Sequence, residues 1–371
     1  MAQFNVLMFG SRRAGKSSIL SSMIDSFDAL KSTTASNITL TATEDTAGIL
    51  KAKKADLKKI FEMKIHDSMK WSIDVGATEA AYEYEFTMSA PGSEKHKLCF
   101  KDIPGEWLMT NEATLKEELK KSQIIIIAID TPHLIEEDGQ HSDAYHITSN
   151  VNTLLSYIKS SEYVPRLVLF VPIKCEKYFH EGRMEEVTAA IEDQYQDLLT
   201  ALRTGKKKEL YTVAITPILS LGGVVFRDFM RDENGDVDVI QLHDSKNPSL
   251  YLRPKAAYYK LYEPAPVFAP KYCEQPVLYI LSFISKQVQN MQVLAAEKLP
   301  KRRNGGGLIT KIVFSIIAII FHAYPVLVLI WGDMFKDKEF VQTASKTAVH
   351  LQTTGDGYKI LQDPLGIQNL K

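Results

Sequence analysis

The chain has 371 residues, of which 45% are hydrophobic and 24% are charged, so a disordered or fibrous chain is excluded. Its 44 Lys and Arg residues nearly balance 45 Asp and Glu residues, so no general attraction to nucleic acid is expected. The three cysteines have no metal-type spacing, which argues against a disulfide scaffold and a cysteine zinc site.

Strand-like and helix-like segments alternate along the first 295 residues. Short β-branched runs predict buried strands at residues 4–9, 124–129, 167–171 and 211–218. Segments long enough for crossover helices lie between them, at residues 16–28, 113–121 and 184–203. Strict alternation over residues 82–88, a Pro-Gly turn and a return at 98–100 predict one hairpin. The pattern predicts an α/β domain with a mostly parallel sheet and helices on both faces.

The first strand leads into a phosphate-binding motif. Residues 10–17, GSRRAGKS, match GxxxxGK[ST] between a strand and a helix. Its glycines let backbone N–H groups face phosphates, and the helix start adds the positive end of its dipole. We expect Lys16 to reach the β- and γ-phosphates and Ser17 to ligate Mg²⁺. Further nucleotide contacts are expected from Gly10, Ser11, Arg12, Arg13, Ala14, Gly15 and Ser18.

Two arginines inside this loop leave three interpretations open. Arg12 and Arg13 could crowd an attacking water, act as an arginine finger supplied in cis, or point to solvent.

A second motif, Asp102-Ile103-Pro104-Gly105-Glu106, follows the returning strand of the hairpin. An aspartate at a strand end can hold Mg²⁺ through water, and the Gly105 N–H can reach a γ-phosphate. This DxxG arrangement resembles the second switch of P-loop GTPases of the Ras-like and translation-factor-related class. The resemblance covers about residues 4–290 and implies that Glu106 orients the attacking water.

The same resemblance implies a first-switch threonine before the hairpin. Thr78, in Gly76-Ala77-Thr78, is the candidate ligand for Mg²⁺ and the γ-phosphate. Because the segment before Thr78 is long, Thr41, Thr43 and Thr46 are alternatives.

Base recognition in the family uses NKxD after the next strand. Here the strand leads into Ile173-Lys174-Cys175-Glu176. Lys174 could lie along the base and Glu176 could accept from guanine, but Ile173 replaces the asparagine and puts guanine specificity in doubt. Ser220 and Leu221, after the strand at 211–218, occupy the position of the family's last base-contacting loop.

Two insertions are expected in the GTPase domain of residues 1–295, at about 29–75 and 231–265. The first contains a lysine-rich helical stretch at 51–64, with a solvated face or a contact to anionic lipid. The inserted first switch, the DxPGE motif and Cys273-Glu274-Gln275-Pro276 before an apolar helix are loosely similar to bacterial conflict- or secretion-associated GTPases.

A membrane anchor is predicted at residues 312–331, twenty residues without a formal charge. A basic, glycine-rich linker at 296–311 fits a cytoplasmic flank, Trp331 fits the far interface, and 332–371 reads as a polar tail. A hairpin anchor, a buried core helix and two short strands remain open because of Pro325.

These expectations describe a membrane-anchored GTPase with its domain in the cytoplasm, which hydrolyses GTP with Mg²⁺ and acts as a conformational switch. A protein partner is expected at the switch loops, and no nucleic acid. An ATPase of the same fold and a nucleotide-binding membrane scaffold without hydrolysis are the alternatives.

Overall fold

The computed structural model describes residues 1–10, 14–33, 37–62, 81–105, 107, 111–156, 164–204, 208–242, 251–263, 267–297, 331, 334 and 336–369. Within these residues one sheet has the strand order β12-β13-β7-β6-β5-β1-β4-β3-β2. Its strands are β1 (Gln3–Phe9), β2 (Thr39–Ala42), β3 (Tyr82–Ser89), β4 (His96–Asp102), β5 (Ile124–Asp130), β6 (Arg166–Ile173), β7 (Tyr211–Ile215), β12 (Thr354–Gly355) and β13 (Tyr358–Gln362).

The centre of the sheet is parallel and its two margins are antiparallel. Strands β7, β6, β5, β1 and β4 run in the same direction. The pairs β2–β3, β3–β4, β7–β13 and β12–β13 are antiparallel. Every residue of β5 is buried, which explains its unbroken apolar sequence. The α/β fold with a mostly parallel sheet is therefore as expected.

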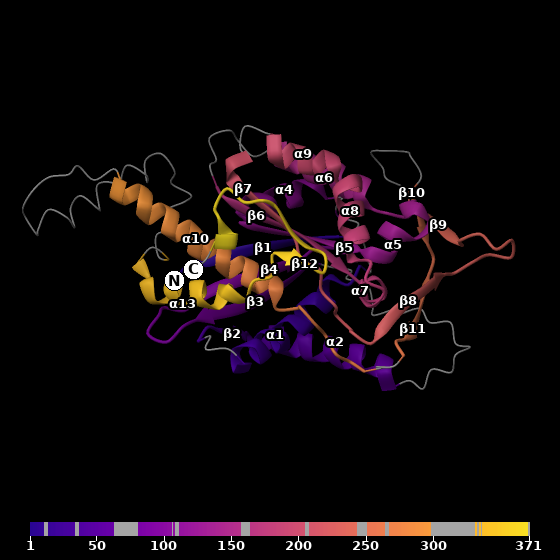
Figure 1. Ribbon diagram of the computed structural model, residues 1–371, viewed down its shortest axis with the longest axis horizontal. Coiled ribbons are helices and arrows are strands. Elements are labelled where there is room, and N and C mark those ends of the chain that lie inside the picture. The colour runs from indigo at the N-terminus through magenta and orange to yellow at the C-terminus, as the bar shows by residue number, and fades with distance from the viewer. Residues whose placement is uncertain are drawn as a thin grey trace, which may run out of the picture.

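Helices cover both faces of this sheet (Figure 1). One face packs against α1 (Lys16–Thr33), α10 (Gln275–Glu297) and α13 (Lys338–Thr347). The other packs against α4 (Glu112–Lys121), α6 (Ala144–Ser156), α8 (Met184–Gln194) and α9 (Gln196–Thr204). Two short helices, α5 (Thr131–Ile135) and α7 (Glu176–His180), follow β5 and β6, and η1 (Glu136–Gly139) follows α5.

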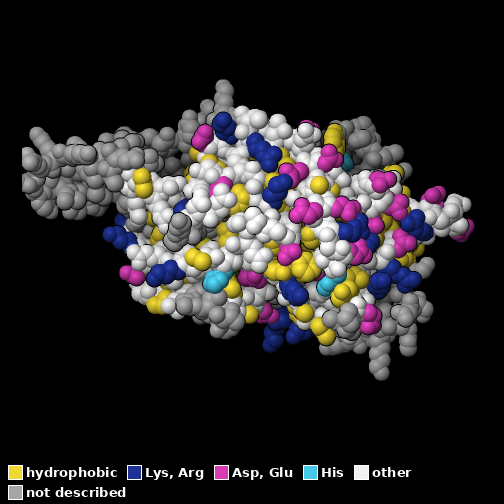
Figure 2. Space-filling model, in the orientation of Figure 1, with side chains coloured by type: hydrophobic (Ala, Val, Ile, Leu, Met, Phe, Trp, Pro, Cys, Tyr) yellow, Lys and Arg dark blue, Asp and Glu magenta, His cyan; other side chains and the backbone are white. Residues whose placement is uncertain are grey.

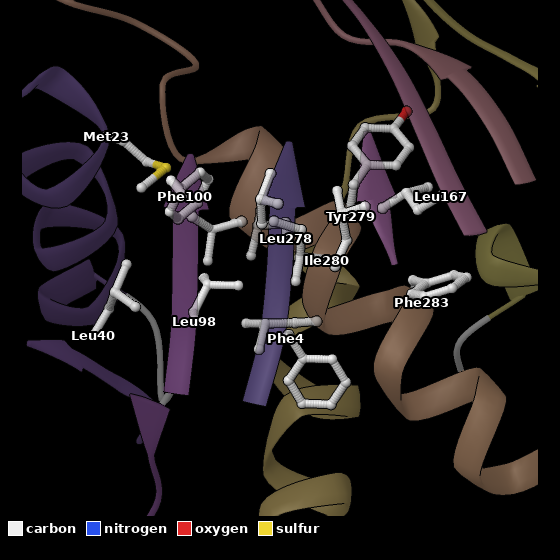
Figure 3. Close-up of a cluster of buried hydrophobic side chains, with 14 of the residues drawn as sticks. Phe4, Met23, Leu40, Leu98, Phe100, Leu167, Leu278, Tyr279, Ile280 and Phe283 are labelled. Carbon is white, nitrogen blue, oxygen red and sulfur yellow. The ribbon is translucent and has the colours of Figure 1, made fainter. Parts of the chain in front are cut away.

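The core on the α1 and α10 face joins distant parts of the chain (Figure 3). Phe4 of β1 and Phe100 of β4 face Leu278 and Phe283 of α10, and all four side chains are fully buried. Burying such side chains contributes about 1.5–3 kcal/mol each. This packing holds β1 and β4 in place against α10 and so fixes the position of their C-terminal ends.

The second insertion contains two separate two-stranded antiparallel sheets. Strand β8 (Val224–Phe229) pairs antiparallel with β11 (Ala257–Leu261), and β9 (Val239–Leu242) pairs with β10 (Tyr251–Pro254). The β8–β11 sheet begins at Val224, before the expected boundary at 231. Its inner face packs on Leu57 of α2 (Glu44–Glu62) and on Leu221, which attaches the insertion to the domain.

Residues 332–371, expected to form a polar tail, contribute α13 and β13 to the fold. Strand β13 extends the sheet by pairing with β7, with Lys359 opposite Ile215. Helix α13 is held at its start by Asp337, whose Oδ2 lies 2.9 Å from His96 Nε2. This polar segment is ordered because β13 pairs with the edge of β7 and because Asp337 contacts the buried His96.

The predicted membrane anchor requires correction. Among the residues described by the structure, none of the helices combines the length and apolarity needed to cross a bilayer. Of the segment 312–331, only Trp331 lies within the described residues. Its ring is fully buried and lies 5.3 Å from that of Phe4, edge to face, instead of at a membrane interface. The expected membrane location and membrane partner therefore have no support in the described residues.

Charged side chains of both signs are interspersed on the face shown in Figure 2. Ion pairs between neighbouring elements of the fold include Lys101–Glu118 at 3.0 Å and Lys177–Glu136 at 2.6 Å. This mixture matches the net charge of −1 for the whole sequence.

Candidate functional site

The phosphate-binding motif lies between the end of β1 and the start of α1, where the sequence placed it. Gly10 has φ 146°, and a Cβ there would lie 2.7 Å from the Ala128 carbonyl oxygen. Gly15 has φ 104°, and its Cβ would lie 3.3 Å from Ile173 Cδ1. Both positions therefore require glycine for backbone conformation and for space. Ala14 is buried beside Gly15, and Ser11, Arg12 and Arg13 lie outside the described residues.

Lys16 begins α1 and turns back over the loop. Its side chain is only 5% exposed, and Nζ donates to the Gly10 carbonyl at 3.1 Å. The same Nζ lies 3.8 Å from Asp102 Oδ1. The ammonium is thus held at the mouth of the loop, where it can meet a phosphate. Ser18 follows within α1, and its N–H donates to the Gly15 carbonyl at 2.9 Å.

Ser17 and Asp102 are brought together by the pairing of β1 with β4. The Ser17 hydroxyl donates to Asp102 Oδ2 at 2.6 Å, and Asp102 is fully buried. Asp102 Oδ1 has no hydrogen-bond partner among the described residues, although Lys16 lies nearby. A buried carboxylate oxygen with an open position, next to a serine hydroxyl, suits a hard cation with water ligands such as Mg²⁺. The residues present therefore fit the metal that the motif implies.

A tyrosine that the sequence analysis did not select lies beside this pair. Tyr84 of β3 is fully buried, and its hydroxyl has no hydrogen-bond partner among the described residues. Burial raises the pKa of Tyr84 to about 12, so the phenol stays protonated. The sequence predicts the hairpin strand that carries Tyr84, but not that this side chain lies beside Ser17 and Asp102.

The second switch is described only in part. Gly105 is buried, and the Trp107 N–H donates to the Pro104 carbonyl at 3.0 Å, which closes the turn after β4. Glu106 lies outside the described residues, so its role as the water-orienting group stays a prediction.

The first-switch threonine Thr78 also lies outside the described residues. Two of its alternatives have other partners. Thr43 Oγ1 donates to Thr46 Oγ1 at 3.0 Å, and Thr46 Oγ1 accepts from the Glu85 N–H at 3.0 Å. These hydroxyls fasten the start of α2 to β3, and Thr41 lies in β2 opposite Thr87.

The segment expected to recognise the base, residues 173–176, begins at the last residue of β6. Ile173 is buried against Gly15, so an apolar contact stands where the family has an asparagine amide. Lys174 has φ 56°, and its Nζ donates to Asp130 Oδ2 at 2.5 Å. A lysine in the left-handed region is uncommon and indicates that its surroundings fix the turn.

Glu176 connects this segment to the loop after β7. It is 2% exposed, and its Oε1 accepts from the N–H groups of Leu221 at 3.0 Å and Gly222 at 3.3 Å. Burial raises the pKa of Glu176, and these N–H donors oppose the rise. The Ser220 carbonyl accepts from Ser22 of α1 at 3.3 Å. The structure therefore brings Lys174, Glu176, Ser220 and Leu221 to the same end of the sheet as Lys16.

The sequence analysis also missed Asp130. It ends the apolar run of β5 and lies opposite Ile173 in the parallel ladder. An acid directly after a buried strand is the signal that singled out Asp102, and it would have singled out Asp130 as well.

Comparison with known proteins yields one family match. A family profile described as Double-GTPase 2 matches residues 6–215. No curated protein matches the chain.

Among solved structures, the GTP-bound Ski7 GTPase-like domain of S. cerevisiae is 14% identical, with 59% of this chain and 43% of that chain covered and a TM-score of 0.33. The GTP-bound SRb/SRX signal recognition particle receptor complex of Chaetomium thermophilum is 13% identical, with 60% of this chain and 93% of that chain covered and a TM-score of 0.34. Roco2 of Methanosarcina barkeri, bound to GDP, is 13% identical, with 59% and 44% covered and a TM-score of 0.27. The chain thus spans less than half the length of the Ski7 and Roco2 chains, and these superpositions are too loose to add to the family match.

Proposed function

Because the chain belongs to the Double-GTPase 2 family, a P-loop GTPase family of the Ras-like and translation-factor-related class, we propose that it binds GTP at the β1–α1 loop and hydrolyses it to GDP and phosphate. The observation that carries the proposal is the cluster of Lys16, Ser17 and Asp102. A buried cation, a hydroxyl and a buried carboxylate meet within 4 Å at the start of a helix. Loop N–H groups and the dipole of α1 add to the positive field that a triphosphate needs.

Lys16 would contact the β- and γ-phosphates, with the backbone of residues 10–17 around them. Ser17 and Asp102 would hold Mg²⁺, Ser17 directly and Asp102 through water. The bound ion would neutralise charge on the phosphate oxygens. Lys16 is kept over the loop by the Gly10 carbonyl, so little ordering is needed when the nucleotide arrives.

Hydrolysis would need a water aligned with the γ-phosphate. Glu106 is the proposed group that orients this water, and the Gly105 N–H and Thr78 would contact the γ-phosphate. The hydrogen bond from the Trp107 N–H to the Pro104 carbonyl supports this placement, because it lies just after Asp102 ends β4. Arg12 and Arg13 are the remaining candidates for stabilising the negative charge that would develop on the phosphate.

Guanine is the proposed base. The Lys174 stem would lie along it, and Glu176, which accepts from the Leu221 N–H, would accept from the edge of the base. ATP is the alternative, favoured by the specific observation that Ile173 packs on Gly15 where the family has an amide. The two nucleotide states would differ at Gly105 and Thr78, so a protein partner would read them there.

The test uses the full chain. Labelled GTP is titrated against unlabelled ATP with and without Mg²⁺, and single-turnover phosphate release is followed in the same samples. Lys16→Ala should weaken GTP binding by about tenfold or more. Lys59→Ala is the matched control, because Lys59 is exposed on α2, and it should leave binding unchanged.

Each outcome selects one function. GTP-selective binding with Lys16-dependent release supports the GTPase. ATP-selective binding would contradict the proposal that the base site recognises guanine. Selective binding without release in a single turnover would replace the enzyme by a nucleotide-binding scaffold.

A further inference from the structure

Lys174, the residue proposed to lie along the base, is tied to a buried carboxylate of the neighbouring strand. Its Nζ donates to Asp130 Oδ2 at 2.5 Å, and Asp130 is 2% exposed while the Lys174 side chain is 26% exposed. Asp130 lies opposite Ile173 in the ladder between β5 and β6, so the ladder brings the two side chains together. The Lys174 ammonium is therefore held by a buried carboxylate, although the lysine side chain itself is partly exposed.

The surroundings keep Asp130 ionised. Burial opposes its charge, but nearby positive groups hold its pKa below the usual value. His133 is neutral at neutral pH because burial lowers its own pKa to about 3. The permanent charges near Asp130 are therefore those of Lys174 and of Arg253, which is 8% exposed on β10.

Asp130 still has one open position. Its Oδ1 lacks a hydrogen-bond partner among the described residues, so Lys174 is the group that fixes the carboxylate. The rings of His133 and Phe229 lie 5.4 Å apart, so β8 of the insertion packs against the short helix that follows Asp130. The Asp130–Lys174 bond joins two charged groups, of which the carboxylate is buried, and this strengthens it.

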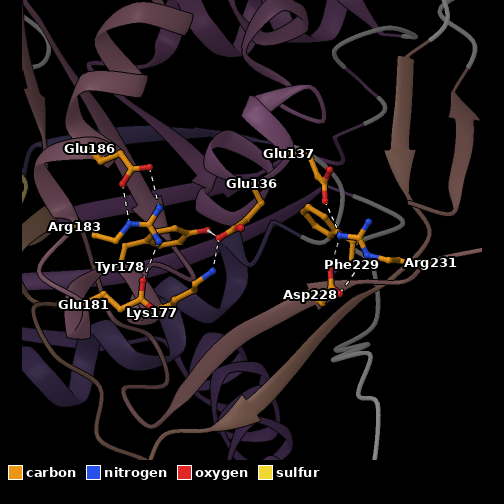
Figure 4. A network of polar contacts seen from close by, with 10 residues as sticks. All are labelled: Glu136, Glu137, Lys177, Tyr178, Glu181, Arg183, Glu186, Asp228, Phe229 and Arg231. Carbon is orange, nitrogen blue, oxygen red and sulfur yellow. Dashed lines mark hydrogen bonds and ion pairs between the residues drawn. The ribbon is translucent and has the colours of Figure 1, made fainter. Parts of the chain in front are cut away.

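Ion pairs join the turns that follow β5 and β6 to each other and to the insertion (Figure 4). Glu137 of η1 accepts from Arg231 at 2.7 Å, and Glu136 accepts from Lys177 of α7 at 2.6 Å. Because η1 and α7 follow β5 and β6, these contacts hold the insertion near the strand ends at Asp130 and Lys174.

We propose that Asp130 is a positioning residue for the nucleotide base, which holds the ammonium of Lys174 so that the lysine stem is pre-set as one wall of the base site. This inference rests on the proposed function. The left-handed backbone at Lys174 supports it, since an unanchored lysine would not keep that conformation. Without Asp130, the side chain would have to be ordered anew for each nucleotide, which lowers affinity mainly through faster release.

The test is a double-mutant cycle in the full chain. Asp130→Asn removes the charge, Lys174→Met keeps the stem without the ammonium, and the double variant combines them. Asp56→Asn is the control, because Asp56 forms an exposed aspartate–lysine pair, with Lys59, on α2. Dissociation constants and release rates of fluorescent GDP and GTP are measured for each.

Asp130→Asn should weaken guanine nucleotide binding by about tenfold, as loss of a charged hydrogen bond predicts. In the Lys174→Met background the same change should have little further effect, because its target is gone. A merely structural role would give additive losses, which overturns the inference. Equal affinity of Asp130→Asn and the wild type also overturns it.

Lys174→Met keeps the inference testable if Asp130→Asn does not fold, since Lys174 is partly exposed. The Lys174→Met variant, in which Asp130 is intact, must bind guanine nucleotide more weakly than the wild type. Unchanged affinity for the nucleotide overturns the inference. If the wild type binds no guanine nucleotide, the proposed function fails first. If it binds and the cycle is additive, only the role of Asp130 fails.

Discussion

The Ser17 hydroxyl lies 2.6 Å from Asp102 Oδ2, although 85 positions separate the two residues in the sequence. The contact exists because β1 and β4 are parallel neighbours whose C-terminal ends meet at one edge, with Met8 opposite Asp102. Helix α1 then starts directly above that edge. The contact therefore depends on the order of strands in the sheet as much as on the two motifs.

Asp102→Asn should make nucleotide binding much less responsive to Mg²⁺. Removing the charge leaves Lys16 without its buried counter-ion and removes an oxygen suited to the hydrated cation. Affinity for GTP at saturating Mg²⁺ should fall by about tenfold or more, with a smaller change in the presence of a chelator. Equilibrium titrations over a range of Mg²⁺ check this, with exposed Asp56→Asn as the control. An equal loss with and without Mg²⁺ would contradict the metal role.

The fold was predictable where local pattern and global packing agree. The run at 124–129 reads as a buried strand because β5 is covered on both faces. The motif at 10–17 predicts a loop because only glycine fits at Gly10 against Ala128. Lys16, Ser17 and Asp102 could be selected because each motif follows a recognisable strand.

The rest depends on contacts that local sequence does not encode. The uncharged run ending at Trp331 has the length of a bilayer span, and composition cannot reveal that its ring packs on Phe4. Strand β13 forms because β7 offers an open edge, a property of the sheet rather than of residues 358–362. Likewise, the bond from Lys174 to Asp130 appears only when β5 and β6 are neighbours.

Gly222→Ala should destabilise the protein far more than Gly235→Ala. Both glycines have positive φ, 74° and 90°, so both changes carry a backbone cost of about 1–2 kcal/mol. A Cβ at Gly222 would lie 2.0 Å from the Ala269 carbonyl oxygen, whereas nothing lies within 4 Å at Gly235. The clash should add about 1–3 kcal/mol, which urea unfolding of both variants measures.

The same change should also disturb the base site, because the Gly222 N–H donates to Glu176. A loss of preference for GTP over ATP in Gly222→Ala, with Gly235→Ala unaffected, is the expected result. Equal stability of the two variants would show that the loop moves away from Ala269 at no cost.

His133 should make the fold sensitive to acid. Burial lowers its pKa to about 3 in the folded protein, against about 6.5 in the unfolded chain. Between these values the unfolded chain binds more protons, so stability is highest above about pH 6.5 and falls as pH decreases. The free energy of unfolding should fall by at most about 1.4 kcal/mol per pH unit from this group.

His133→Phe removes the titrating ring and keeps an aromatic contact with Phe229. Urea unfolding from about pH 7 to about pH 5 should then show a shallower decline than in the wild type. The control is His350→Phe, at an exposed position, which should keep the wild-type slope. Parallel slopes for the wild type and His133→Phe would contradict burial of the neutral ring.

Trp331 should contribute more to stability than any exposed residue of the C-terminal region. Its indole is fully buried, with ring centroids 5.3 Å from Phe4 and 5.9 Å from Phe283. Trp331→Ala removes an aromatic side chain that joins β1 to α10, so the free energy of unfolding should fall by about 3–5 kcal/mol. Val293→Ala, on the same α10 but 54% exposed, is the matched control and should change stability by no more than about 0.5 kcal/mol. Since a residue at a membrane interface would not support the core of the sheet, a loss in Trp331→Ala as small as in the control would count against this packing.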